Sequence, residues 1–314
     1  MFKIGQIPRP DAIFKTIGWC DPSTKAYEGF CQMYDIPYVT AEVPYYANDR
    51  AFEFFLREFK QAIAKLEEIT GNKIDEDKLR HYCEVSNEQL WYMMQLQEMR
   101  KQCPCPDTGW HRSTDTAFAN YLGYPQLTSY WKTLYEDVKE RYDKKQGVIP
   151  EGMDEIRCIM GYAWAGYAAT VYDWMEDTYG ATYVNGFLTY WPEMLRPTDT
   201  TSIETMIHDL AWRSFNAPMQ RQAMTHSQLW IQDILRVCRM DKADALLLLG
   251  NRACKHFWAM HKLVGEQAKD ELGIPSITFE FEILDGRIMP VAEYKRKLAM
   301  FFEMIQANRE GQDT

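Results

Sequence analysis

The stretch Asp244-Ala-Leu-Leu-Leu-Leu-Gly-Asn-Arg-Ala-Cys-Lys255 decides the fold of this chain. Its aliphatic run, 245–249, is bounded by a glycine and an asparagine and predicts a fully buried strand. Apolar residues then recur at helical spacing until Gly273, which predicts the end of that helix. A second extended segment, 276–282, follows. The whole is a strand–helix–strand unit, which within one sheet is parallel and right-handed.

Cys254 lies where the first strand of this unit ends and the helix begins. Open parallel sheets bind ligands beyond the carboxyl ends of their strands, where the N–H groups of helix N-termini face the crevice. The helix dipole favours a thiolate there, so Cys254 is a candidate ligand or nucleophile. The alternative is a small apolar side chain that only packs.

The same pattern occurs near the start of the chain. An apolar run from Asp11 ends at Gly18 and Cys20, and a helix-compatible segment follows. Asp35-Ile-Pro37 then reopens a strand, just as Gly273-Ile-Pro275 does in the other unit. Two units with a cysteine at the same strand-to-helix switch favour a functional role for both thiols.

Composition bounds the class of protein. The 314 residues are 46% hydrophobic and 14% aromatic, which predicts a globular chain long enough for two domains. A net charge of −10 disfavours nucleic acid or an anionic membrane as the main partner. The sequence shows no membrane-spanning apolar run and no signal peptide, so we expect a cytoplasmic protein. Its eight cysteines are then thiols or metal ligands before they are disulfides.

The order of predicted elements gives the fold class. Helices are expected over 48–70 and 75–101, and a further helical segment over 114–145 is interrupted near Gly123. Strands and helices alternate throughout the second half. We predict an α/β protein with two Rossmann- or flavodoxin-like parallel-sheet domains and an added helical lobe. Residues 1–147 form the domain with the lobe and Cys20, and residues 148–314 form the doubly wound domain with Cys254.

A set of short motifs in fixed order resembles the 2-hydroxyacyl-CoA dehydratase and benzoyl-CoA reductase subunit family. No single motif is specific, but the ordered set spans nearly the whole chain. It consists of Trp19-Cys20-Asp21, Leu66-Glu-Glu-Ile-Thr-Gly-Asn-Lys-Ile-Asp75, Ser86-Asn87-Glu88, Asn251-Arg-Ala-Cys-Lys255, Gly273-Ile-Pro275, Asp285-Gly-Arg287 and Phe301-Phe-Glu303.

The resemblance implies a function. In that family each subunit holds a [4Fe-4S] cluster with three cysteines between α/β domains. An ATP-hydrolysing iron–sulfur activator protein supplies a low-potential electron, which passes to an acyl-CoA bound at two homologous subunits. The chain is therefore expected to be one subunit of such an enzyme, and either dehydration of a 2-hydroxyacyl-CoA or reduction of an aryl-CoA ring fits.

The resemblance also implies site residues. Cys20 and Cys254 match the second and third cluster cysteines, whereas the first, expected ahead of Ile7, has no counterpart in this sequence. The missing ligand would come from another polypeptide or a non-cysteine group. The residues expected to contact cofactor stand beside the cysteines or at a strand tip on the same crevice edge, and they are Asp21, Asn251, Arg252 and Tyr162.

Other candidates have structural alternatives. Cys103 and Cys105 share a proline-locked turn and are possible substitute ligands, while the remaining four cysteines suit core packing. His256 and His261 follow Cys254 and could bond a substrate, but surface or interface histidines are the favoured interpretation. The segment Trp110-His111-Arg112 could meet a phosphate or could be an ordinary capped loop.

Two further functions stay open at this point. A cluster-free partner subunit would keep the fold and lend only structure or part of a substrate channel, which the absent first cysteine suggests. A double-cubane-type reductase of the same superfamily would act on small molecules and would need more cluster cysteines.

Overall fold

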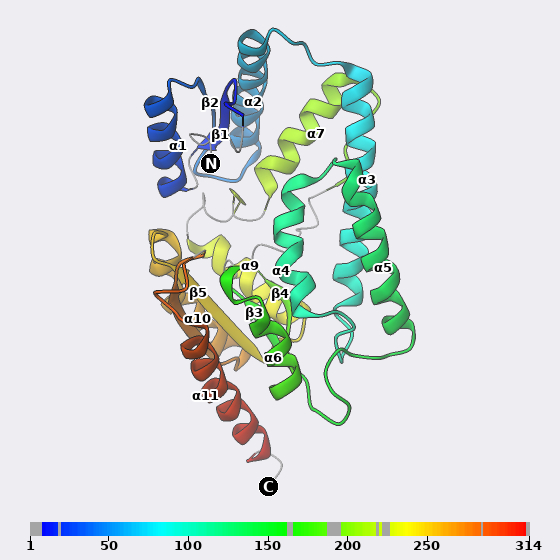
Figure 1. Cartoon of the computed structure of the whole chain (residues 1–314), viewed down its shortest axis with the longest axis vertical. Coiled ribbons are helices and arrows are strands. Elements are labelled where there is room, and N and C mark those ends of the chain that lie inside the picture. The colour runs from blue at the N-terminus through cyan, green and yellow to red at the C-terminus, as the bar shows by residue number, and fades with distance from the viewer. Residues whose placement is uncertain are drawn as a thin grey trace. The chain divides into compact units, whose positions relative to one another are not determined.

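The computed structural model describes residues 8–17, 20–161, 166–186, 196–217, 220–221, 227–283 and 285–311. The chain is an α/β protein, mostly helical, with a two-stranded and a four-stranded parallel sheet (Figure 1). The predicted α/β class is thereby confirmed. By contacts the chain divides into unit 1, Met1–Glu84 with Pro192–His226, and unit 2, Val85–Trp191 with Ser227–Thr314. This division differs from the expected boundary at residues 147 and 148, which stays a prediction.

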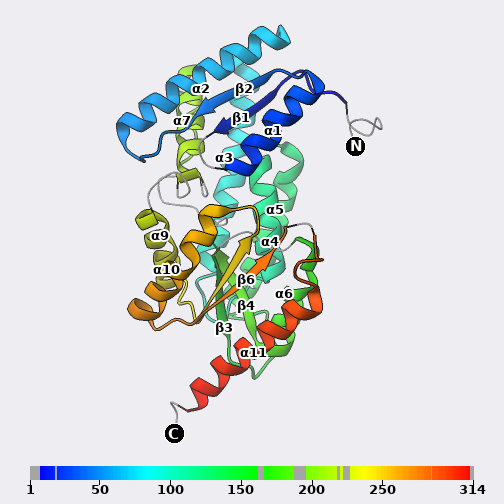
Figure 2. The same cartoon turned by 90° about the vertical axis from the view of Figure 1, so that its left-hand side faces the viewer.

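The sheet of unit 1 is the smaller of the two. Strand β1 (Ile13–Ile17) pairs in parallel with β2 (Tyr38–Glu42), and Ile17 lies opposite Glu42 at their carboxyl ends. Helix α1 (Asp21–Tyr34) makes the crossover and ends at Asp35, whose φ of 51° is left-handed. Helices α1 and α2 lie on opposite faces of the sheet (Figure 2). The predicted strand–helix–strand unit around Cys20 is thus present.

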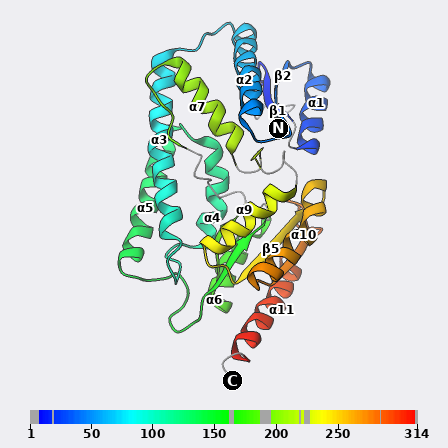
Figure 3. The same ribbon diagram turned by 180° about the vertical axis from the view of Figure 1, so that it is seen from behind.

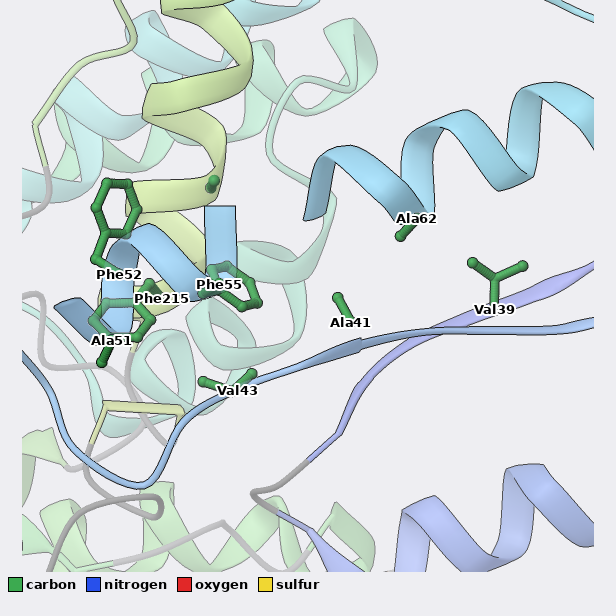
Figure 4. Close-up of a cluster of buried hydrophobic side chains, with 9 residues drawn as sticks. Val39, Ala41, Val43, Ala51, Phe52, Phe55, Ala62 and Phe215 are labelled. Carbon is green, nitrogen blue, oxygen red and sulfur yellow. The ribbon is translucent and has the colours of Figure 1, made fainter. Parts of the chain in front are cut away.

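The core of unit 1 lies between β2 and two helices. Helix α2 (Asp49–Thr70) is capped by Asn48, whose Oδ1 accepts from the Ala51 N–H at 2.9 Å, and α7 (Ile203–Asn216) packs beside it. Strand β2 contributes small and branched side chains, whereas the helices contribute aromatic ones (Figure 4). The buried members are Val39, Ala41, Val43, Ala51, Phe52, Phe55, Ala62, Ala211 and Phe215.

Helix α3 (Glu76–Met99) supplies its first residues to unit 1 and the rest to unit 2. Asp75 caps it as expected, because its Oδ1 accepts from the Lys78 N–H at 3.0 Å. The helical segment expected over 114–145 is instead two helices, α4 (Gly109–Phe118) and α5 (Thr128–Asp143). Short 3-10 turns at Ala119–Tyr121 and Pro125–Leu127 separate them, where the interruption was predicted.

The four-stranded sheet of unit 2 has the strand order β4-β3-β5-β6 and is parallel throughout. Every residue of its three strands β3 (Ile156–Met160), β4 (Ala181–Gly186) and β5 (Ala245–Asn251) is buried. The edge strand β6 (Ser276–Phe281) alternates at its end between exposed and buried positions. Burial on both faces explains the continuous aliphatic run of the β5 sequence.

Helices cover both faces of this sheet. A 3-10 turn (Gly166–Ala168) and α6 (Thr170–Tyr179) connect β3 to β4, and α10 (Lys255–Leu272) connects β5 to β6. Because these crossovers run in opposite directions along the sheet and are right-handed, their helices lie on opposite faces. Helix α9 (Ser227–Met240) packs beside α10 (Figure 3), and α11 (Val291–Glu310) packs against α6.

The aromatic core of unit 1 gives a stability prediction. Phe55 is fully buried, with ring centroids 5.9 Å from Phe59 and 5.8 Å from Phe215. Phe55→Ala should lower the free energy of unfolding by about 3–5 kcal/mol, because it leaves a cavity. Met33→Ala, at a side chain that is 71% exposed on α1, is the control and should change it by less than about 0.5 kcal/mol. Urea unfolding followed by circular dichroism measures both, and equal midpoints would contradict this account.

Candidate functional site

Cys254 caps the helix that follows the central strand β5. Its backbone φ of −93° and ψ of 92° are extended, and its side chain makes no capping hydrogen bond to α10. The Cys254 N–H donates to the Asn251 carbonyl at 2.9 Å, and the side chain is half-buried. The first N–H groups of α10 therefore surround a sulfur that does not cap them, an arrangement that favours a thiolate.

This position is the topological switch point of the sheet in unit 2. The connections from β3 and β5 leave in opposite directions, so a crevice opens at the carboxyl ends of these neighbouring strands. The Gly161 N–H, just after β3, donates to the Leu247 carbonyl of β5 at 2.8 Å and marks that edge. The predicted contact residue Tyr162 lies outside the described residues.

Cys20 holds the equivalent position in unit 1. It is the N-cap of α1 with φ −142° and ψ 90°, its side chain makes no capping bond, and it is half-buried. Its carbonyl accepts from the Thr24 N–H at 2.9 Å. On β1 nearby, burial lowers the pKa of Lys15, and the negative charge of a Cys20 thiolate opposes that shift. A buried ammonium within electrostatic range is a second feature that favours a thiolate at Cys20.

The residues beside the two cysteines have different surroundings. The Asn251 amide is 6% exposed and bonds within its own loop, because Nδ2 donates to Glu282 at 3.2 Å and Oδ1 accepts from the Ala253 N–H at 2.9 Å. Arg252 is exposed and pairs with Glu280 at 2.6 Å, an exchangeable surface contact. Asp21 is exposed in the first turn of α1. Their expected contact with a cofactor stays a prediction.

A glycine lets α10 pack closely over the end of β5. A Cβ on Gly250 would lie 2.7 Å from the Trp258 ring and 2.9 Å from the His261 ring. The Trp258 Nε1–H donates to the Asn251 carbonyl at 3.0 Å and holds the loop. His261 was expected at the surface or an interface, but it is buried because α10 turns it onto β5. Burial lowers its pKa to about 4, so the ring is neutral, while His256 is exposed as expected.

The other six cysteines do not look like ligands. All eight cysteines are described, and none forms a disulfide. Cys105 is buried with its Sγ 3.3 Å from the Asp107 carbonyl oxygen, and burial raises its pKa to about 12. Burial also raises the pKa of the Cys158 thiol well above its usual range. Only Cys103 is exposed, and the buried thiols pack as predicted.

Unit 2 contains a buried charged cluster that the sequence did not reveal. Asp107 receives Arg100 Nε at 2.6 Å and His111 Nδ1 at 2.7 Å, and these cations hold the pKa of that carboxyl at about 2 although burial opposes the shift. Asp115 receives Arg100 and Arg112 at 2.8 and 2.9 Å. The only signal in the sequence was the clustering of charged residues within 100–115 between predicted helices.

This cluster decides between the two interpretations of Trp110-His111-Arg112. Arg112 is 1% exposed, and its guanidinium also donates to Asn185 on β4 at 2.6 Å. Asn185 in turn donates to Asp241 at 2.8 Å. Arg112 therefore joins α4 to the sheet and is not available to a phosphate in solution, which favours the structural interpretation.

Comparisons with known proteins agree with the positions of these motifs. The family described as 2-hydroxyglutaryl-CoA dehydratase, D-component, matches residues 3–305. The chain is 21% identical to lactoyl-CoA dehydratase subunit alpha of Anaerotignum propionicum, and the alignment covers 96% of this chain and 71% of that protein. It is 22% identical to (R)-2-hydroxyglutaryl-CoA dehydratase subunit alpha of Acidaminococcus fermentans, over 97% and 62%. A benzoyl-CoA reductase subunit from Thauera aromatica is 21% identical over 97% and 72%.

Two helices that each begin at a cysteine beside a parallel-strand edge place this chain among the α/β proteins with strand-end sites. More specifically, the chain belongs to the 2-hydroxyacyl-CoA dehydratase and benzoyl-CoA reductase subunit family, whose members include acyl-CoA dehydratases and reductases. The resemblance noted in the sequence is confirmed. The chain spans between 62% and 73% of the length of these relatives. In the part of the chain that the structure describes, no helix is both long and apolar enough to cross a membrane.

Glu176 of α6 gives a pH-dependent prediction for unit 2. It is 5% exposed, and burial raises its pKa from 4.5 to about 7, although the Gly109 N–H bond to its Oε1 at 2.7 Å opposes the shift. The folded state thus binds this proton more tightly than the unfolded state, and wild-type stability falls as pH rises from about 4.5 through 7. Glu176→Gln should gain up to about 3 kcal/mol relative to wild type at pH 8 and little at pH 5.

Urea unfolding at both pH values tests this expectation. Gln keeps an oxygen that can accept from the Gly109 N–H, so the change removes mainly the titration. Glu266→Gln, at an exposed residue of α10, is the control and should not alter the pH dependence. A Glu176→Gln advantage of the same size at pH 5 and pH 8 would show that this carboxyl does not titrate in that range.

Proposed function

We propose that this chain is a subunit of an iron–sulfur, ATP-activated one-electron acyl-CoA enzyme of the 2-hydroxyacyl-CoA dehydratase or benzoyl-CoA reductase type. The observation that carries the proposal is the pair of cysteines, Cys20 and Cys254, each at the N-cap of the helix after a parallel strand. In this proposal they hold or share a [4Fe-4S] cluster. The sequence motifs around both cysteines and the family membership support it.

The proposal includes a finer fold class. The β4-β3-β5-β6 order with helices on both faces supports a flavodoxin- or Rossmann-like domain in unit 2, and the β1-α1-β2 crossover supports a smaller domain of the same kind in unit 1. The helices α3, α4 and α5 form the added helical lobe. Both cysteines then occupy the type of sheet edge at which such domains bind their ligands.

The cysteines in hand are an incomplete ligand set. A four-iron cluster takes about four cysteinyl ligands, or about three when one iron is open to substrate. Each unit offers one suitably placed cysteine, and among the described residues there is no group of three or more histidine, cysteine or acidic side chains arranged to bind a metal. Neither unit alone fits the cluster, so at least one ligand has to come from elsewhere, such as a second polypeptide.

The substrate and partners follow from the relatives. The names of the relatives refer to lactoyl-CoA, 2-hydroxyglutaryl-CoA and benzoyl-CoA, and several are alpha subunits. We propose an acyl-CoA substrate, a homologous second subunit and an ATP-hydrolysing iron–sulfur activator protein as partners. A cytoplasmic location, which the thiol-rich composition predicts, is part of the same proposal.

A second candidate is a cluster-free partner subunit that lends structure to such a complex. The observation that favours it is the single suitable cysteine in each unit. A double-cubane-type reductase, by contrast, needs further cluster cysteines. Five of the other six are buried, and Cys103 alone is exposed, so the structure offers little support for that third function.

Iron and acid-labile sulfide content after oxygen-free purification separates the candidates. Co-expressed with its homologous subunit, the chain should carry about four irons per site. Cys20→Ser and Cys254→Ser should each lose most of the iron, because each removes one thiolate ligand. Cys103→Ser, at the exposed cysteine outside the proposed site, is the matched control and should keep the iron. Colourless protein with no iron, whether the chain is purified alone or co-expressed, would contradict the redox role and leave the structural one.

A further inference from the structure

A hollow in unit 1 lies at the same sheet edge as Cys20. Because β1 and β2 are parallel and Ile17 lies opposite Glu42, both strands release the chain at one edge. Cys20 follows β1, while a hollow of about 450 Å³ follows β2 and is closed by the first two turns of α2. Neighbouring strands are only about 4.8 Å apart, so an extended ligand can reach from this hollow to the Cys20 edge.

Two arginines give this hollow its charge. Arg50 and Arg57 are exposed residues seven positions apart, two turns along one face of α2, and both line the hollow. Within the described residues neither guanidinium forms an ion pair, although the chain as a whole is acidic. The only acidic side chain among the described lining residues is Glu42. A guanidinium fork matches phosphate oxygens well, so this face suits a phosphorylated ligand.

Aromatic rings stand beside the arginines. Phe54 lies between them on α2, with the Arg57 Cζ 5.8 Å from its ring centroid. Tyr46 is 59% exposed and packs edge-on to Tyr45 at 5.3 Å between centroids. Exposed aromatic faces stack on nucleobases without reading their sequence. Phosphate-binding cations with aromatic faces in one hollow define a site for a nucleotide.

We propose that this hollow binds the 3′-phosphoadenosine diphosphate end of coenzyme A. Arg50 and Arg57 contact its phosphates, Tyr46 and Phe54 contact the adenine ring, and the pantetheine arm runs along the strand ends towards Cys20. The inference rests on the proposed function for its substrate class. It adds where the nucleotide of the acyl-CoA binds and which residues of unit 1 recognise it.

Calorimetric titration of the full chain tests the site. CoA and adenosine 3′,5′-bisphosphate should bind, and dephospho-CoA should bind more weakly because it lacks the 3′-phosphate. Arg50→Ala and Arg57→Ala should each weaken CoA binding about tenfold, the loss expected for one charge-assisted contact. Tyr46→Ala should weaken adenosine 3′,5′-bisphosphate but not pantetheine. The control, Lys65→Ala, removes an exposed cation farther along α2 that pairs with Glu68, and it should leave binding unchanged.

Three results would overturn the site. They are a wild-type chain that does not bind CoA, an Arg50→Ala/Arg57→Ala double variant that binds CoA as well as wild type, and inorganic phosphate that competes as well as the bisphosphate. Iron content is a separate readout. Cluster without arginine-dependent CoA binding sinks this inference alone, whereas arginine-dependent CoA binding without iron upholds it and removes the redox role.

Discussion

Paired parallel strands release the chain at the same edge of their sheet, and the positions of both candidate cysteines depend on this constraint. Each crossover has to return through a helix, so each strand end becomes the N-terminus of a helix. In unit 1 this places Cys20 beside the segment that follows β2, and in unit 2 it places Cys254 beside the end of β3. The chemistry proposed for the chain uses these edges because backbone donors already gather there.

Buried guanidinium groups hold the rest of unit 2 in place. Arg157 on β3 is 3% exposed and donates to the carbonyls of Arg100, Gln102 and Asp241 at 2.7 to 2.9 Å. It thereby satisfies peptide groups that the break after α3 leaves without helical partners. Arg100 itself reaches Asp107 and Asp115. Removing one member of such a network leaves a buried charge unpaired, which is why these side chains matter more to the lobe than its surface ion pairs do.

Local patterns in the sequence were enough to predict most of the fold. The aliphatic run of β5, the Gly273 stop and the repeated Ile-Pro entry are local signals, and each describes an element that forms in the structure. The cysteines at the helix N-caps could be placed for the same reason. The discontinuous composition of unit 1 could not be foreseen, because pairing α7 with α2 depends on contacts between distant parts of the chain. The buried polar cluster was missed because charged residues in a loop look solvated until a strand such as β4 covers them.

The discontinuity of unit 1 has a consequence for synthesis of the protein. Phe52 and Phe55 are made early, but Phe215, which packs against both, comes only after residues 85–191 have been translated. At ordinary translation rates that interval is roughly 5 to 20 s, far longer than hydrophobic collapse takes. The first 84 residues therefore emerge from the ribosome with an apolar helix face that they cannot cover themselves. Nascent chains of this protein are a natural client for a chaperone that shields aromatic surface until α7 arrives.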